Sequence, residues 1–307
     1  MRVVSLLPSA TEIVYLLGLG EQLVGVSHEC DYPPAARGKP KIIKSAIASS
    51  GSTSREIDTR VRTFLERGEG IYRIDREALE AADPDLILTQ ELCEVCAAPY
   101  REVVAAAATL LRKPEILSLD PQCFDDVLTD VSRVGEATGR LGEAEKVVAS
   151  LQARIERVTQ GAAKAPTRPT VVCLEWLDPV MVSGHWIPEM VALAGGTEVL
   201  GNPGAPSRRV AWEQVLSAAP AVLILMPCGF SVERVLGEIH LLTGLPGWAG
   251  LPAVRCGRVF AVNGHALYSR SGPRLVEGIE VLAHLVHPEL FPGPVPENAV
   301  RTVSRYG

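Results

Sequence analysis

The strongest periodic pattern of apolar and polar positions lies near the middle of the chain, over residues Gly142 to Gln160. Apolar residues recur there at three- and four-residue steps (Val147, Leu151, Ile155 and Val158), and charged residues cover the other faces. This spacing predicts one continuous amphipathic helix of about 28 Å, at about 1.5 Å per residue. A helix of that length is about as long as a small domain is wide, so it can connect two domains as a strut.

Short apolar runs alternate with helical patterns in the first half of the chain. Buried strands are predicted at Arg2–Leu7, Leu23–Ser27 and Leu86–Thr89. The helix after the first strand is expected to have its cap at Ser9 and to stop at Gly18. Strands that alternate with helices predict a mostly parallel sheet.

The second half of the chain repeats this plan, with strands predicted at TVVCL, AVLIL and RVFAV. One internal match is specific: Leu79–Thr89 and Leu216–Met226 share a helix end, a proline and an apolar strand. A glutamate lies seven residues before the proline in each copy, Glu77 in the first and Glu213 in the second. Two related α/β lobes are the simplest explanation, and chance similarity between two α/β units is the alternative.

Composition limits the possible partners. A chain of 307 residues with 47% hydrophobic content can bury two ordinary cores, which agrees with the internal match. The net charge of −6 argues against nucleic acid as a partner. Apolar runs fall short of the roughly 20 residues that cross a membrane.

The N-terminal sequence MRVVSLLPSATE enters a strand directly, without the charged and long apolar regions of a signal peptide. As written, the protein is expected in the cytosol, unless a leader was removed or lies upstream. Seven cysteines is an odd number, so complete pairing within one chain is impossible and reduced thiols are the default interpretation.

A ligand in an open parallel sheet binds beyond the carboxyl ends of the strands, where loops converge. The loops after the predicted strands carry the chemically unusual residues of this chain, namely Trp176, Trp186, Tyr268, Glu29, Glu175, Arg270, His28, His185, His265, Cys30, Cys93, Cys96 and Cys228. Aromatic faces with a few polar groups are typical of a site for a flat or bulky organic ligand. Because nucleophile-elbow, P-loop and dinucleotide-binding motifs are absent, the sequence favours binding over catalysis, and no enzyme activity is expected.

The cysteines support an alternative from another functional class. Cys93 and Cys96 form a C-x-x-C motif, which fits a redox pair, half of a metal site or two ordinary buried thiols. With Cys228, and with Cys30 or His28, they would belong to a cytosolic metal- or heme-binding protein or a thiol redox enzyme. Bound metal is therefore possible under this hypothesis.

Several stretches together resemble the substrate-binding proteins of iron-siderophore and cobalamin ABC importers: RVVSLLPSATEIVYLLGLG, LVGVSHECDYPP, ADPDLIL, the long central helix and SRSGPRLVEGIEVLA. The resemblance covers nearly the whole chain and is closest to cobalamin-binding proteins. It implies an α/β fold of two Rossmann-like lobes with parallel sheets, joined by a single long rigid helix, with one ligand in the cleft and little movement on binding. The lobes are then expected at residues 1–122 and 166–290, with connecting helices at 123–165 and a tail at 291–307.

The resemblance implies ligand contacts at Glu29, Trp176, Ser207, Tyr268 and Arg270, and the aromatic residues of the loops add Trp186. The three aromatic rings would stack against cobalamin or a related metal chelate, and Arg270 would meet a polar or anionic group. A surface salt bridge is the alternative for Arg270. The positions of Glu29 and Ser207 are aromatic in the best-known cobalamin binder, which leaves the ligand open.

The resemblance also gives Glu77 and Glu213 a role, because such proteins present one exposed glutamate per lobe to arginines of the membrane permease. Without the resemblance, both would be interpreted as solvated glutamates that stabilise helix N-termini. The expected partners are a small-molecule ligand and an ABC importer permease, and the protein itself is expected to be a monomer that requires no resident cofactor. This role implies a location in the periplasm or at the outer face of the membrane, in contrast to the cytosolic expectation above.

Overall fold

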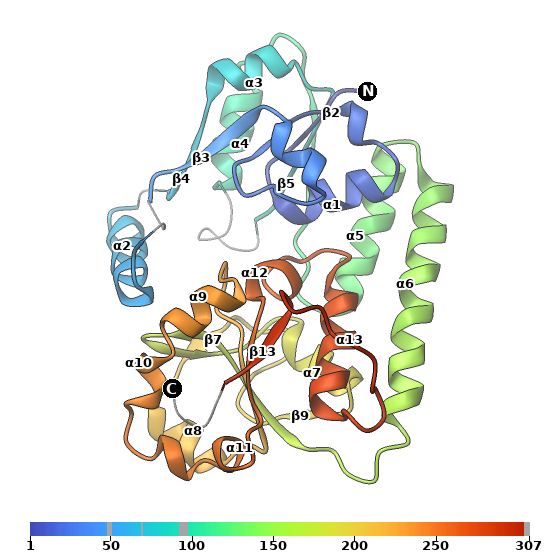
Figure 1. Ribbon diagram of the computed structural model, residues 1–307. Helices are drawn as coiled ribbons and strands as arrows, with labels where there is room; N and C mark the ends of the chain where they lie inside the picture. Colours follow the sequence, from blue (N-terminus) through green and yellow to red (C-terminus); the bar gives the residue numbers. More distant parts are fainter. Residues whose placement is uncertain (48–50, 69, 92–97, 304–307) are drawn as a thin grey trace. The chain divides into compact units, whose positions relative to one another are not determined.

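The computed structural model describes residues 1–47, 51–68, 70–91 and 98–303 (Figure 1). The chain divides into two compact units. Unit 1 comprises Met1–Ser52, Glu56–Pro121 and Asp125–Ser150, and unit 2 comprises Thr53–Arg55, Gln122–Phe124 and Leu151–Gly307. Each unit has its own sheet and its own core.

Unit 1 is built on a six-stranded sheet with the order β4-β3-β2-β1-β5-β6, in which β3 and β4 are antiparallel and the other neighbours are parallel. The strands are β1 (Val3–Ser5), β2 (Leu23–Ser27), β3 (Lys41–Ser45), β4 (Tyr72–Ile74), β5 (Leu86–Thr89) and β6 (Glu115–Ser118). The α-helices of this part of the chain are α1 (Pro8–Leu16), α2 (Ser54–Glu66), α3 (Arg76–Ala82), α4 (Tyr100–Ala107) and α5 (Phe124–Ala137).

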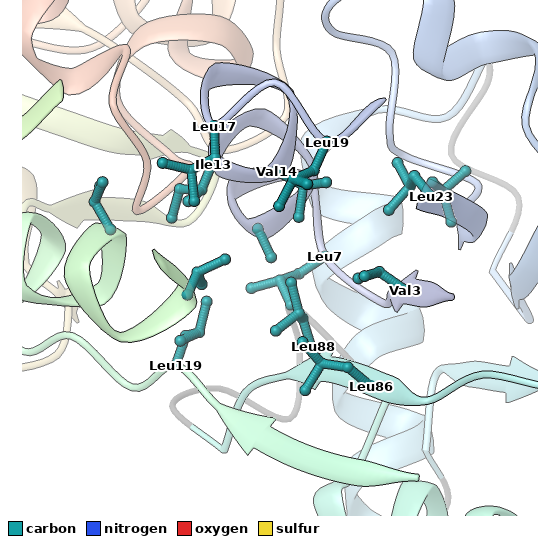
Figure 2. Packing of buried hydrophobic residues seen from close by; sticks show 14 of the residues in the cluster. Val3, Leu7, Ile13, Val14, Leu17, Leu19, Leu23, Leu86, Leu88 and Leu119 are labelled. Carbon is teal, nitrogen blue, oxygen red and sulfur yellow. The ribbon is translucent and has the colours of Figure 1, made fainter. Parts of the chain in front are cut away.

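Side chains that alternate along the central strands of unit 1 fill a core on each face of the sheet. Val3, Leu86 and Leu88 join residues of α1 and α5 in one core, which Figure 2 shows around Leu7. The intervening Val4 and Ile87 join residues of α3 and α4 in the other. A sheet that is covered on both faces has buried strands with few polar residues, and the sequences of these strands are therefore continuous apolar runs.

Unit 2 contains a sheet with the order β10-β8-β7-β11-β12-β13, and β9 pairs with β7 beside this path. Its strands are β7 (Thr170–Leu177), β8 (Val180–Val182), β9 (Thr197–Glu198), β10 (Arg208–Arg209), β11 (Val222–Leu225), β12 (Val259–Val262) and β13 (Val300–Thr302). The helices are α7 (Ile187–Leu193), α8 (Trp212–Ala218), α9 (Val232–Gly237), α10 (His240–Thr243), α11 (Pro252–Arg255), α12 (Gly264–Leu267) and α13 (Leu275–Val286). The central strands β7, β11 and β12 are parallel, and the strands toward both edges are antiparallel.

The central helix of the sequence is α6 (Leu141–Ala162), which is continuous over 22 residues (Figure 1). It begins one residue before the predicted helix and ends two residues after it. Its first part belongs to unit 1, where Ala144 joins the core of α1 and α5. Its second part belongs to unit 2, where Arg154 makes two hydrogen bonds to Glu280 of α13, at 2.9 Å and 2.6 Å.

The strands predicted at Leu23–Ser27 and Leu86–Thr89 are confirmed residue for residue as β2 and β5. The predicted cap at Ser9 is wrong. Helix α1 begins at Pro8 and has Leu7 at its N-cap. Proline suits the first helical position because its φ is fixed near the helical value, and because an N–H at that position would have no hydrogen-bond partner within the helix. No helix in the described part of the chain is long and apolar enough to cross a membrane.

The internal match of the sequence corresponds to a structural repeat. In unit 1, α3 ends at the left-handed residue Asp83 (φ 37°) and leads into β5, and in unit 2, α8 ends at the left-handed residue Ala219 (φ 44°) and leads into β11. A proline follows each of these residues, and both strands lie inside their sheets. Helix end, turn and strand therefore agree residue for residue.

The contact between α5 and α6 should depend on Gly135. A Cβ atom at this position would meet the Cβ of Ala144 and lie 3.2 Å from the carbonyl oxygen of Arg140. Gly135→Ala should therefore lower the free energy of unfolding by about 1–3 kcal/mol through overpacking, as measured by urea denaturation. Gly142→Ala is the matched control: nothing lies within 4 Å of its added Cβ, so stability should stay unchanged or rise by up to about 1 kcal/mol. Equal stability of the two variants would contradict close packing at Gly135.

Candidate functional site

The parallel strands of unit 2 bring three loops to one edge of its sheet. β11 pairs with β7 on one side and with β12 on the other, so the segments after these strands are neighbours. Backbone hydrogen bonds connect the first two segments, from Cys228 N to the oxygen of Glu175 at 3.1 Å, and the next two, from His265 N to the oxygen of Phe230 at 3.1 Å. The residues expected to bind a ligand in this unit lie on or beside these segments.

Trp176 is a partly exposed aromatic residue near the end of β7. Its Nε1 donates a hydrogen bond to the carbonyl oxygen of Asp178 at 3.1 Å, and its ring lies edge-on to Phe230, with 5.2 Å between the ring centroids. The guanidinium of Arg234 lies 3.9 Å from the centre of the Phe230 ring. The sequence interpretation missed Phe230 and Arg234, although their spacing of four residues is the separation at which side chains meet in a helical segment.

Trp186 and Tyr268 are buried, with 6% and 2% of their surface exposed. Trp186 Nε1 donates to the backbone oxygen of Tyr268 at 2.8 Å, and the Tyr268 hydroxyl donates to the backbone oxygen of Gly278 in α13 at 3.2 Å. Both polar tips are satisfied inside unit 2, and the rings pack beneath the loops. The structure leaves little of either ring exposed, and the expected stacking of Trp186 and Tyr268 against a ligand stays a prediction.

Arg270 is largely buried, with 9% of its surface exposed. Its Nη2 lies 2.6 Å from Nε2 of His265. Because guanidinium only donates, this contact makes Nε2 the acceptor and assigns the proton of a neutral His265 ring to Nδ1. Arg270 thus orients His265, and most of its surface lies inside the unit rather than toward solvent.

Glu175 and Ser207 are brought together from positions 32 residues apart, and the Ser207 hydroxyl donates a hydrogen bond to the Glu175 carboxylate. The backbone N–H of Gly184 donates to the same carboxylate. Burial raises the pKa of Glu175 to about 7, against the effect of these two hydrogen bonds. The sequence analysis named Glu175 among the loop residues and Ser207 among the contacts implied by the resemblance, but did not pair them, because nothing in the local pattern specifies a contact across that separation.

Glu29 and Cys30 lie in unit 1, directly after β2. Glu29 is exposed, and its carboxylate lies 3.3 Å from Nε2 of His28, whose ring is 5.7 Å from that of Tyr72. Cys30 is buried and accepts a hydrogen bond from the Thr11 hydroxyl at 3.1 Å. The expected contact of Glu29 with a ligand stays a prediction.

The cysteine alternative gains no support from the described residues. Cys93 and Cys96 lie outside the described residues, so the role of the C-x-x-C motif stays a prediction. Within the described ranges, no group of three or more His, Cys, Asp and Glu side chains could hold a metal ion. Cys228 is exposed in unit 2, whereas Cys30 belongs to the core of unit 1.

Glu77 and Glu213 occupy the same position in the structural repeat. Each is exposed and is the second residue of its helix, Glu77 in α3 and Glu213 in α8. A carboxylate at that position also interacts favourably with the helix dipole. Each unit therefore presents an equivalent exposed carboxylate in the first turn of the helix that precedes β5 or β11.

The chain is similar to known proteins over most of its length. The model of the periplasmic binding protein family matches residues 3–265. The vitamin B12-binding protein of Vibrio cholerae is 27% identical over 283 residues, which cover 91% of this chain and 86% of that protein. The uncharacterised ABC transporter substrate-binding lipoprotein YvrC of Bacillus subtilis is 25% identical over 300 residues, covering 94% and 81%. The periplasmic heme-binding protein RhuT from Roseiflexus sp. RS-1, solved in apo form, has a TM-score of 0.69 and 25% identity, covering 94% of this chain and 98% of that one.

The burial of Tyr268 leads to a prediction that separates packing from ligand contact. Tyr268→Phe keeps the buried ring and removes only the hydrogen bond to Gly278, so the free energy of unfolding should fall by about 1 kcal/mol. Any ligand affinity of the protein should stay unchanged. Thermal unfolding and calorimetric titration measure the two effects, and a loss of affinity without a loss of stability would identify Tyr268 as a ligand contact.

Proposed function

The chain belongs to the periplasmic binding protein family, and from this premise we propose that it captures a corrinoid or a similar metal chelate and delivers it to an ABC importer. Proteins of this family are binding components of transport systems rather than enzymes. The proposal agrees with two relatives, one that binds vitamin B12 and one that is a substrate-binding lipoprotein of an ABC transporter. Like them, this chain is proposed to act outside the cytoplasmic membrane.

One observation supports a flat chelate as the ligand: Trp176 is partly exposed at the carboxyl edge of the sheet, next to Phe230, whose ring Arg234 contacts. An indole face offers a large rigid area for a macrocycle at a low cost in conformational entropy. Trp176 is held by its hydrogen bond to Asp178 and its contact with Phe230, so little ordering would be needed on binding. Glu29, Ser207 and Arg270 stay proposed contacts for the polar groups of the ligand.

We also propose that α6 restricts the movement of the two units on binding. The helix contributes Ala144 to the core of unit 1, and its Arg154 is fixed to Glu280 by two charge-assisted hydrogen bonds in unit 2. A continuous helix with both parts bound to sheet-covering elements resists bending, because bending breaks its own backbone hydrogen bonds. We propose that the protein is a monomer and that it holds its ligand in a largely preformed site.

Glu77 and Glu213 are the proposed contacts with the importer permease. Their equivalent positions on α3 and α8 give each unit the same exposed carboxylate, which fits recognition by arginines. No other pair of exposed carboxylates is singled out by the internal repeat in the described part of the chain.

The ligand proposal is tested by visible absorption and calorimetric titration with cobalamin, heme and a ferric chelate. At least one should bind with micromolar or better affinity, and Trp176→Ala should weaken that binding by about 5- to 30-fold, which corresponds to about 1–2 kcal/mol of lost stacking. Trp176→Phe is the control, because it keeps an aromatic face and should lose less. If none of the three probes binds to the wild-type protein, the proposed cargo is wrong.

The docking proposal is tested with the double variant Glu77→Arg, Glu213→Arg. Ligand affinity should be unchanged, because both residues lie on exposed helix turns, whereas ligand uptake through the cognate importer should be lost through repulsion between like charges. Glu80→Arg, an exposed position on the same helix as Glu77, controls for a general effect of added positive charge. Unchanged uptake by the double variant would reject the docking role.

A further inference from the structure

Three segments of unit 2 meet at the carboxyl group of Glu175. The first is the end of β7, which carries Glu175 itself. The second is the 183–186 loop, whose Gly184 N–H donates to this carboxyl group. The third is the 204–207 loop, whose Ser207 hydroxyl donates to it as well. One acceptor group therefore holds two loops that are separated in sequence.

The two loops are also fixed to each other. His185 N donates to the oxygen of Ala205 at 2.7 Å, and Gly204 N donates to the oxygen of His185 at 3.0 Å. The approach is so close that a Cβ atom on Gly184 would meet the Ala205 oxygen and lie 2.6 Å from Ser207 N. The loops thus move together, and the Glu175 carboxyl group connects the pair to the sheet.

His185 shows that this arrangement stores strain. Its φ of 49° lies in the left-handed region, which a non-glycine residue adopts at a cost of about 1–3 kcal/mol. Its Nδ1 is buried without a hydrogen-bond partner in the described part of the chain. Such a conformation persists only where neighbouring contacts impose it, and here the contacts are the backbone hydrogen bonds of His185 with Ala205 and Gly204.

We propose that Glu175 is a positioning residue for ligand capture, which holds the 183–186 and 204–207 loops against β7 and changes their placement when it gains or loses a proton. This inference rests on the proposed function, because Ser207 and the neighbouring Trp176 are proposed ligand contacts. Glu175 itself acts through the two loops and needs no contact with the ligand.

The charge of Glu175 sets the direction of the effect. An ionised carboxylate accepts two charge-assisted hydrogen bonds, from Ser207 and Gly184, whereas a protonated carboxyl group is a weaker acceptor for both. The ionisable groups that face it are Glu198 on β9, which opposes ionisation, and the Cys173 thiol on β7. Since the pKa of Glu175 is about 7, the loops should be held more tightly as the pH rises through 7, and ligand affinity should rise with them.

The ligand arm of the test is a calorimetric titration between pH 5.5 and 8.5, with cobalamin in the first instance, or with the chelate that binds in the titration above. Wild-type affinity should rise by about threefold to tenfold between pH 6 and 8, as expected for one linked proton. Glu175→Gln, which resembles the protonated group, should keep the low-pH affinity throughout. Glu198→Gln removes a charge that opposes ionisation of Glu175, so affinity in this variant should still rise with pH, but around a lower midpoint than in the wild type. Equal pH dependence in the wild type and Glu175→Gln would overturn the proposal.

A second arm needs no ligand. In nuclear magnetic resonance spectra of the free protein, the Glu175 carboxyl carbon and the amides of Gly184 and Ser207 should titrate together near pH 7. Ser207→Ala removes a bond that favours the ionised form, so it should raise this midpoint. A Gly184 amide that does not follow Glu175, or an unchanged midpoint in Ser207→Ala, would overturn the positioning role. If no chelate binds, the proposed function fails, and this arm alone decides about Glu175.

Discussion

Parallel pairing of β7, β11 and β12 is the constraint on which the candidate site depends. Parallel strands direct their carboxyl ends to one edge, so each connection must return across the face of the sheet before the next strand begins. Trp176 lies near the end of β7, and Phe230 and His265 follow β11 and β12, so the three residues gather at one edge although they span 90 residues of sequence. The ligand proposal is a consequence of this pairing more than of any single motif.

The aromatic residues at this edge form two groups, which differ in their burial and in the location of the hydrogen-bond partners of their N–H and O–H groups. Trp186 and Tyr268 direct their N–H and O–H groups to backbone oxygens inside the unit, which removes the cost of burying them. Trp176 donates its N–H to the backbone oxygen of Asp178, in the turn after β7, and part of its surface is exposed. The two buried rings pack inside the unit, and the partly exposed ring of Trp176 is the one on which the ligand proposal rests.

Local sequence patterns predicted the features that local physics determines. Alternating apolar runs and helical periodicity predicted β2, β5 and α6 almost to the residue, and the family resemblance was confirmed. Burial and pairing of side chains could not be predicted in this way. Tyr268 is buried because α13 places Gly278 against it, and Ser207 meets Glu175 because two loops converge, and neither event has a signal near the residue itself.

The division of α6 between two cores has a consequence for folding. Ala144 fills the core of unit 1, while Leu151 and Val158, about two and about four turns further on, are buried in the part that belongs to unit 2. A chain cut in the middle of this helix would leave each half with a shortened, frayed segment and with apolar surface that its own sheet no longer covers. The two units are therefore not autonomous modules on a linker, and the loss of structure in one should be transmitted to the other as cooperative unfolding.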